Sequence, residues 1–176
     1  MAVRFHGWTI GLAALIAAGS LLAAPPHQHG VAQLDVAVDK GRVSIELQTP
    51  LDNLLGFERA PRTDAERDKV AAAVAKLRDG QTLFRIDAAA GCTLIKAELE
   101  SAALELGKTT AQAGDHADLD GHYEFRCKDG ARAGSIEVGL FEAFAGLSRI
   151  ELQVQTPKGQ IKATLRRPAS RVVLVR

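Results

Sequence analysis

The chain has 176 residues, 47% of them hydrophobic and 24% charged, which is enough for one domain with a buried core. Its 22 Lys and Arg residues nearly balance its 21 Asp and Glu residues, and no basic run stands out. A nucleic-acid-binding protein would carry a concentrated positive charge, so the composition excludes that class.

Residues 1–23 have the pattern of a secretory signal peptide. Arg4 supplies its positive charge, an apolar run from Trp8 to Leu22 follows, and small residues offer a cleavage point after Ala23. The apolar run is short for a membrane span, and no later segment is apolar enough to cross a bilayer. Arg4 is the only charged residue of this segment. Cleavage of residues 1–23 would therefore lower the formal net charge of the chain to zero, and we expect the cleaved protein to be exported.

Two strands are predicted on either side of a turn at residues 39–41. Apolar residues alternate with polar ones in both segments, which is the pattern of an antiparallel hairpin with one buried and one solvated face. The apolar positions are Leu34, Val36, Val38, Val43, Ile45 and Leu47. Pro50 ends the second strand, and the apolar connector at 51–57 should pack against the core.

A long helix is predicted to begin after Thr63, where residues 63–66 form a capping box. The Thr63 hydroxyl can accept a hydrogen bond from the Glu66 amide, while the Glu66 side chain reaches back towards the cap. Apolar residues at helical spacing continue to Leu77, and Gly80 should stop the helix.

After this helix the chain alternates between short strand patterns and turns. Strands are predicted over residues 92–100, 116–127, 135–140, 148–155, 160–165 and 172–175, with a helical turn at 141–144. Many strands with one long helix predict an α+β class. We expect a mostly antiparallel or mixed β-sheet with one long helix and one short helical turn, in a single domain over residues 31–176 that follows a flexible tail at 24–30.

The strand predicted over 116–127 carries the strongest chemical signal. Side chains alternate between the two faces of a strand, so one face would be apolar and packed. The other face presents His116, Asp118, Asp120, His122, Glu124 and Arg126. Mixed imidazole and carboxylate ligands suit Zn²⁺, and the first four of these residues could share one tetrahedral zinc shell. The same pattern also fits a solvated strand face or a hairpin turn at 120–121, so both readings stay open.

A second pair of histidines, His27 and His29, lies in the tail. A His-x-His pair near a mature N-terminus is a frequent metal-contacting element, and a tail histidine could complete the shell of the strand site. The alternative is a flexible polar linker. Because the tail has no predicted packing, joining the site would order it and cost conformational entropy.

Cys92 and Cys127 are the only two cysteines of the chain. An even pair in an exported domain predicts a disulfide; zinc ligation by the thiols is the alternative, but no CxxC spacing supports it. The sequence contains no serine-hydrolase, zinc-protease, phosphate-loop or dinucleotide-binding motif, so we expect a non-catalytic protein.

Several short segments of the chain together resemble one known family. They are 27–36 (HQHGVAQLDV), 50–58 (PLDNLLGFE), 60–63 (APRT), 90–93 (AGCT), 116–127, 141–144 (FEAF) and 155–160 (QTPKGQ). Through these segments, which span the mature chain, the sequence is similar to the ZrgA family of Gram-negative periplasmic zinc-binding proteins.

The resemblance implies a periplasmic role in zinc acquisition, buffering or delivery. It implies Zn²⁺ as the bound ion and a component of a zinc uptake transporter as a partner. The segments that carry the metal-binding character of the family contain His27, His29, His116, Asp118, Asp120 and His122. The alternative from another class is an envelope protein–protein interaction module that binds through its exposed strand faces, without specific metal binding.

Overall fold

The computed structural model describes residues 28–107 and 117–174, so the predicted signal peptide, His27 and His116 lie outside the described residues. The helices are α1 (Leu51–Leu55), α2 (Asp64–Arg78), α3 (Gly80–Leu83) and α4 (Leu140–Ala143), with single 3-10 turns at Ala88–Ala90 and Gly130–Arg132. The strands are β1 (Val31–Val38), β2 (Arg42–Pro50), β3 (Phe84–Ile86), β4 (Thr93–Glu100), β5 (Asp118–Arg126), β6 (Ser135–Val138), β7 (Arg149–Thr156), β8 (Gly159–Arg166) and β9 (Arg171–Val173).

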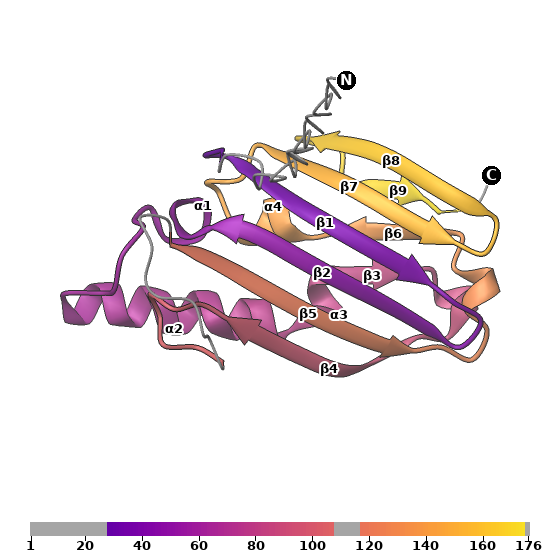
Figure 1. Cartoon of the computed structure of the whole chain (residues 1–176), viewed down its shortest axis with the longest axis horizontal. Coiled ribbons are helices and arrows are strands. Elements are labelled where there is room, and N and C mark those ends of the chain that lie inside the picture. The colour runs from indigo at the N-terminus through magenta and orange to yellow at the C-terminus, as the bar shows by residue number, and fades with distance from the viewer. Residues whose placement is uncertain (1–27, 108–116, 175–176) are drawn as a thin grey trace, which may run out of the picture.

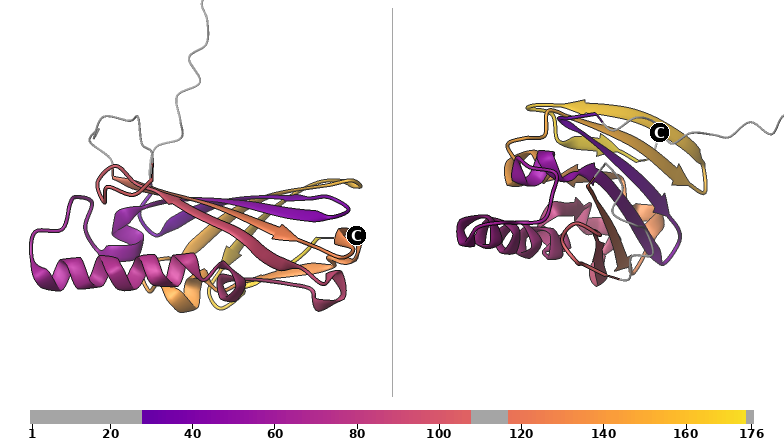
Figure 2. Two further views of the ribbon diagram at one scale, coloured as in Figure 1. Left: turned by 90° about the horizontal axis from the view of Figure 1, so that it is seen from below. Right: turned by 60° about the vertical axis from the view of Figure 1, so that its left-hand side comes forward.

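A six-stranded sheet in the order β4-β5-β2-β1-β7-β8 forms one layer of the molecule. Neighbouring strands are antiparallel except β1 and β7, which are parallel, so the sheet is mixed. A small sheet in the order β3-β6-β9 and the helices pack against one face of it (Figures 1 and 2). In the described part of the chain, no helix or strand covers the other face (Figure 2). The prediction of an α+β fold with a mixed sheet and one long helix is confirmed.

The core lies between the two layers and is built by the alternation of side chains along the strands. In β5, Leu119, Tyr123 and Phe125 are buried, and the residues between them point to the uncovered face. The hairpin of β1 and β2 buries the six apolar residues expected from the sequence: Leu34, Val36, Val38, Val43, Ile45 and Leu47. The predicted polar face of β5 therefore lies on the side of the sheet that is open to solvent.

The capping box at the start of α2 forms as predicted. The Thr63 hydroxyl accepts from the Glu66 amide at 3.2 Å, and the Glu66 carboxylate reaches back to accept from the Arg62 amide at 2.6 Å. The Arg59 guanidinium donates two further hydrogen bonds to the same carboxylate, at 2.7 and 2.9 Å. These contacts join the start of α2 to the segment that follows α1.

The cap gives a pH-dependent contribution to stability. The hydrogen bond from Arg59, followed by the one from the Arg62 amide, lowers the pKa of Glu66 from 4.5 to about 2. Because the pKa of Glu66 is lower in the folded state, its carboxylate stabilises the fold at pH values above its unfolded-state pKa. This stabilisation is lost as the pH falls from 4.5 towards 2. We expect Glu66→Gln to be less stable than wild type at neutral pH and to approach it in acid, measured by denaturant unfolding at several pH values. A difference that does not depend on pH would contradict this.

Gly80 does not simply end the long helix, as the sequence suggested. α2 ends at Arg78, and Gly80 begins the short helix α3, whose Thr82 amide donates to the Asp79 side chain at 3.3 Å. A Cβ at Gly80 would lie 2.7 Å from the Tyr123 ring. The glycine is therefore required by the close packing of α3 on β5.

Tyr123 is fully buried, and its hydroxyl has no hydrogen-bond partner among the described residues. Its ring packs edge-on against Phe84 at 4.9 Å between centroids, so the ring itself contributes to the core. We expect Tyr123→Phe to leave the free energy of unfolding unchanged or to raise it by about 1 kcal/mol, because it removes a buried polar group without changing the packing. Urea unfolding measures this; a loss of stability would reveal a partner for the hydroxyl.

Three local features complete the fold. The connector at 51–57 packs against the core as predicted, but its first part is the helix α1, with Leu51 and Leu55 buried. Cys92 and Cys127 form the predicted disulfide, which joins the start of β4 to the end of β5. The short strand β3 was not predicted.

None of the helices in the described ranges is long and apolar enough to cross a membrane.

Candidate metal centre at the start of β1

The starts of β1 and β5 lie at the same end of the large sheet. Both strands are antiparallel to β2, which lies between them and ends at the helix α1 (Figure 1). The Leu51 amide of α1 donates to the Ala117 carbonyl at 2.9 Å, which fixes the start of β5 beside the helix. The segments that follow His27 and His116 in the sequence therefore converge on α1.

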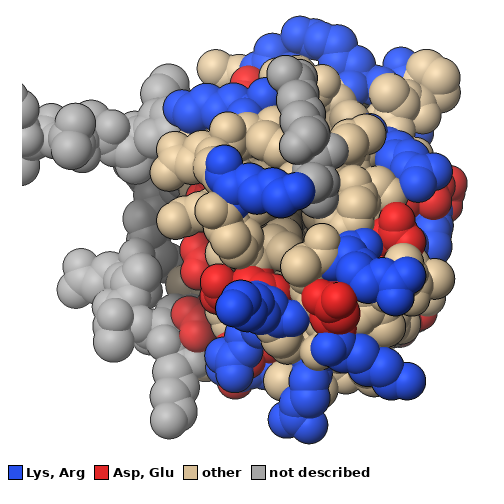
Figure 3. Space-filling view, turned by 90° about the vertical axis from the view of Figure 1, so that its right-hand side faces the viewer, with Lys and Arg blue, Asp and Glu red and all other residues tan. Residues whose placement is uncertain are grey.

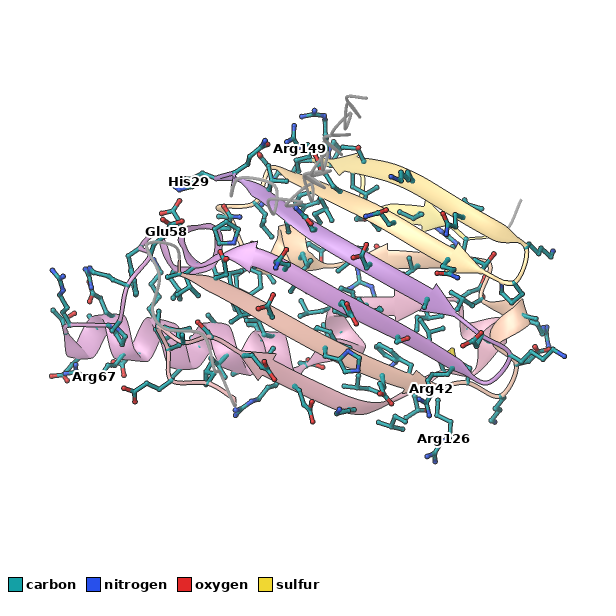
Figure 4. All side chains as sticks on the ribbon, in the orientation of Figure 1. His29, Arg42, Glu58, Arg67, Arg126 and Arg149 are labelled. Carbon is teal, nitrogen blue, oxygen red and sulfur yellow. A yellow bond between two sulfur atoms is a disulfide. The ribbon has the colours of Figure 1, made fainter. Side chains whose placement is uncertain are left out.

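His29 lies at this end of the sheet between two carboxylates. Its Nε2 atom is 3.2 Å from Glu58 Oε1, and its Nδ1 atom is 3.5 Å from Asp52 Oδ2 (Figure 4). The His29 side chain is 66% exposed, whereas those of Asp52 and Glu58 are 36% and 28% exposed. The imidazole is thus accessible from solvent, while its two acidic partners are partly enclosed. We call these three residues the β1-start group.

Backbone turns bring the two acids to His29. Asp52 lies in the first turn of α1, directly after Pro50 has ended β2. Gly56 ends that helix in the left-handed conformation, with φ of 73°, and its amide donates to the Asp52 carbonyl at 2.8 Å. The chain reverses there and returns Glu58 to the start of β1. The next side chain, Arg59, turns away to Glu66, so it does not compete with His29 for Glu58.

The donor atoms of the β1-start group suit zinc. Zn²⁺ binds imidazole nitrogen and carboxylate oxygen, and His29 Nε2 and Glu58 provide one of each. Metal-bound histidines commonly donate their other ring N–H to a carboxylate, which fixes the tautomer and the orientation of the ring. Asp52 lies next to Nδ1 and is placed for that second role. The group therefore offers two ligands and one orienting carboxylate.

The end of the predicted tail is packed. Arg149 Nη2 donates to Gln28 Oε1 at 2.6 Å, and the Val31 amide donates to the Gln28 carbonyl at 3.1 Å. The Gly30 amide donates to Asn53 Oδ1 at 2.5 Å. Residues 28–30 are therefore in contact with the folded domain, and the tail predicted over 24–30 stays a prediction. These contacts come from residues distant in sequence, which a local pattern does not show.

The other predicted ligands that the structure describes lie on the open face of β5. Asp120 Oδ1 accepts from Gln48 Nε2 at 3.3 Å, and the His122 Nε2 atom is 3.2 Å from Glu124 Oε1. The hydrogen bond with His122 is the main cause that lowers the pKa of Glu124. Asp118 and His122 are four residues apart, about 13 Å along a strand, which is too far for both to reach one ion. Asp118, Asp120 and His122 thus share a face but do not converge.

No group of three or more His, Cys, Asp or Glu side chains within residues 28–107 and 117–174 is arranged to hold a metal ion. His27 and His116, the two remaining predicted ligands, lie outside those ranges. The structure therefore brings together one predicted ligand, His29, with two carboxylates that the sequence did not indicate. It leaves the complete predicted ligand set as a prediction.

Acidic side chains from neighbouring strands surround His122 on the open face. Glu46 of β2 and Glu98 of β4 lie directly opposite it, and Asp35 of β1 lies opposite Glu46. Partial burial, and secondly the charge of Glu46, raise the pKa of Asp35. Part of this face forms a hollow of about 400 Å³ lined by Asp35, Glu46, Glu98, Glu100, Asp120 and His122, with neighbouring residues. We call this surface the acidic face.

Basic side chains gather at the other end of the sheet. Figure 3 looks onto that end and shows more Lys and Arg than Asp and Glu. Arg42 and Arg126 lie there, opposite each other on β2 and β5 and far from His29 and Glu58 (Figure 4). The chain is nearly neutral overall, so its charge is distributed unevenly. A cation would be attracted towards the acidic face and away from the basic end.

The sequence pattern did not indicate the acidic neighbours Asp52 and Glu58 of His29, or Glu46 and Glu98 of His122. Glu58 lies 29 residues from His29 along the chain, and no periodicity connects them. The one available signal was the motif at residues 56–58, in which a glycine suited to a left-handed turn precedes the acid by two positions.

Comparison with known proteins supports a family assignment. The family model described as "ZrgA family zinc uptake protein" matches residues 26–174, nearly the whole chain. No curated protein matches the chain.

Proposed function

The chain belongs to the ZrgA family of zinc uptake proteins, and from this membership we propose that it is a periplasmic zinc-binding protein. It takes part in zinc acquisition, buffering or delivery and has no catalytic role. Zinc is its cargo, and a component of a zinc uptake transporter is the partner that would receive it. The observation that carries the proposal is the approach of Glu58 Oε1 to His29 Nε2, at 3.2 Å, in a chain of this family.

His29 and Glu58 are the first two zinc ligands in this proposal, and Asp52 orients the His29 ring. Their solvent-facing side is open, so further ligands can approach. His27 precedes His29 by two residues in the sequence, and His116 precedes Ala117, whose carbonyl lies beside α1 at the start of β5. We propose that two of His27, His116 and Asp118 supply the two remaining ligands of a tetrahedral shell.

Asp120 and His122 have a different role in this proposal, because they lie further along β5. With Glu46 and Glu98 they form part of the acidic face, where like charges lie close together at a cost in stability. Such a surface raises the local concentration of cations. It would guide Zn²⁺ to the β1-start group and hold it only weakly.

Zinc titration of the exported protein tests the proposed function. The protein is purified, treated with a chelator, and titrated with Zn²⁺ in a calorimeter. We expect one tight site, and an affinity that falls from about pH 8 to about pH 5, because imidazole binds metal in its neutral form. Zinc should also raise the thermal midpoint, since it binds the folded state. A chain that binds no zinc would leave the interaction-module alternative, with the uncovered sheet face as its binding surface.

A further inference from the structure

We infer that Asn53 is a positioning residue of the zinc site, which fixes His29 opposite its two carboxylates. This inference rests on the proposed function, because it takes His29 as a zinc ligand. Asn53 is not itself a ligand in this account. It acts through the main chain of the two residues that follow His29.

The Asn53 side chain holds two consecutive residues of the main chain. Its Oδ1 atom accepts from the Gly30 amide at 2.5 Å, and its Nδ2 atom donates to the Val31 carbonyl at 2.8 Å. The second N–H of the amide donates to the Thr49 hydroxyl at 3.0 Å. Asn53 is only 2% exposed, and both of its polar atoms are paired. The amide therefore fixes both the position and the direction of the chain at the start of β1.

The position of Asn53 in the sequence links this clamp to the zinc site. Asn53 follows Asp52 in α1, and Gly30 follows His29. One hydrogen bond, from Gly30 to Asn53, therefore joins the neighbours of two members of the β1-start group. Without that hydrogen bond, the main chain next to His29 would no longer be tied to α1, which carries Asp52 and precedes Glu58.

The surrounding packing makes the clamp rigid. Gly30 has φ of 78°, and its carbonyl accepts from the amides of Ser148 and Arg149 at 2.8 and 2.9 Å. On the other side, a Cβ at Gly146 would lie 2.5 Å from the Asn53 carbonyl oxygen. Neither the helix nor the strand can therefore shift freely to compensate for a lost hydrogen bond.

Burying the amide of an asparagine costs desolvation free energy that an apolar side chain does not cost. Its desolvation is balanced because its oxygen and both of its N–H groups are hydrogen-bonded, and an apolar side chain would fill the same site without that requirement. What the amide gains over an apolar side chain is a fixed geometry for the chain that carries His29. Groups that orient a metal ligand from outside its shell typically contribute about 10- to 100-fold in affinity.

The test compares Asn53→Ala with Thr49→Val in the full-length exported protein. Both variants disturb the same buried hydrogen-bond network, but Thr49→Val leaves the Asn53–Gly30 and Asn53–Val31 contacts in place. We expect zinc affinity, measured by competition with a chelator, to fall at least about 10-fold in Asn53→Ala and to stay within about 3-fold of wild type in Thr49→Val. Unfolding free energies measured on the same samples give the purely structural effect of each change.

A double-mutant cycle with His29→Ala separates positioning from stability. If Asn53 acts through His29, Asn53→Ala lowers zinc affinity in the wild-type background and has no further effect when His29 is absent. Its effect on unfolding persists in both backgrounds. Equal losses of affinity in both backgrounds, or none in either, overturn the inference. If Asn53→Ala does not fold, Asn53→Ser enters the same cycle.

The two proposals fail in different ways. If His29→Ala binds zinc as wild type does, the zinc site proposed at the start of β1 is wrong, whatever Asn53 does. If His29→Ala weakens zinc binding and Asn53→Ala does not, the site stands and the positioning role is overturned.

Discussion

Replacing both Cys92 and Cys127 by alanine is expected to lower the free energy of unfolding by about 4 kcal/mol. The disulfide closes a loop of 35 residues, and the chain-entropy model assigns about this much to a loop of that length. The bridge also joins β4, an edge strand of the large sheet, to β5. Without it, the start of β4 keeps its hydrogen bonds to β5 and the hydrogen bond that the Leu94 amide donates to Gln81 Oε1 at 2.9 Å.

Urea unfolding with and without a thiol reductant measures the effect. The reductant should destabilise wild type and should leave the double-alanine variant unchanged, since that variant has no thiol to reduce. Zinc affinity should be nearly unchanged in the variant, because the bridge lies at the basic end of the sheet, away from His29 (Figure 4). A stability loss below about 1 kcal/mol would show that the unfolded chain is already constrained across this loop.

The fold was predictable where the signal is local. The alternation in β1 and β2, with a turn at 39–41, specified a hairpin, and the structure shows their buried faces as expected. The capping box at Thr63 specified the start of α2 to the residue. Both signals work because neighbouring residues make the decisive contacts.

Other parts of the fold depend on distant residues and gave no local signal. β3 has three residues and is defined by its pairing with β6, about fifty residues later in the chain. The packing of residues 28–30 depends on Asn53 and Arg149. A His-x-His segment next to prolines looks like a linker unless those partners are known.

In the candidate site, too, some residues have a local sequence signal and others depend on contacts between distant parts of the chain. The sequence predicted His29 as a metal ligand and placed His122 on the solvated face of a strand. It did not identify Asp52 and Glu58, because their proximity to His29 follows from the end of β2, the length of α1 and the reversal at Gly56. Histidine is rare enough in this chain to be recognised alone, whereas 21 acidic residues give no such guide.

His29→Ala is expected to weaken zinc binding at least about 100-fold. It removes a ligand, whereas Asp52→Asn removes only an orienting contact and should cost about 10-fold. Glu58→Gln should resemble His29→Ala, because a neutral amide is a poor zinc ligand. The metal-free variants should unfold like wild type, since the His29 side chain is 66% exposed and the acids lie at the surface.

Chelator competition and thermal unfolding, each with and without Zn²⁺, distinguish this site from the strand-face alternative. Glu151→Gln, which removes an exposed acid from the same sheet, is the matched control and should bind zinc like wild type. His122→Ala should change the affinity by less than about 3-fold, because its nearest partners on the open face are Glu124 and Glu46. The zinc-dependent rise in the thermal midpoint should disappear in His29→Ala and persist in His122→Ala. The opposite result would be a zinc-dependent rise that disappears in His122→Ala and persists in His29→Ala. In that case the zinc ligands lie along β5, as the alternation of that strand first suggested, and the β1-start group only anchors the N-terminal segment.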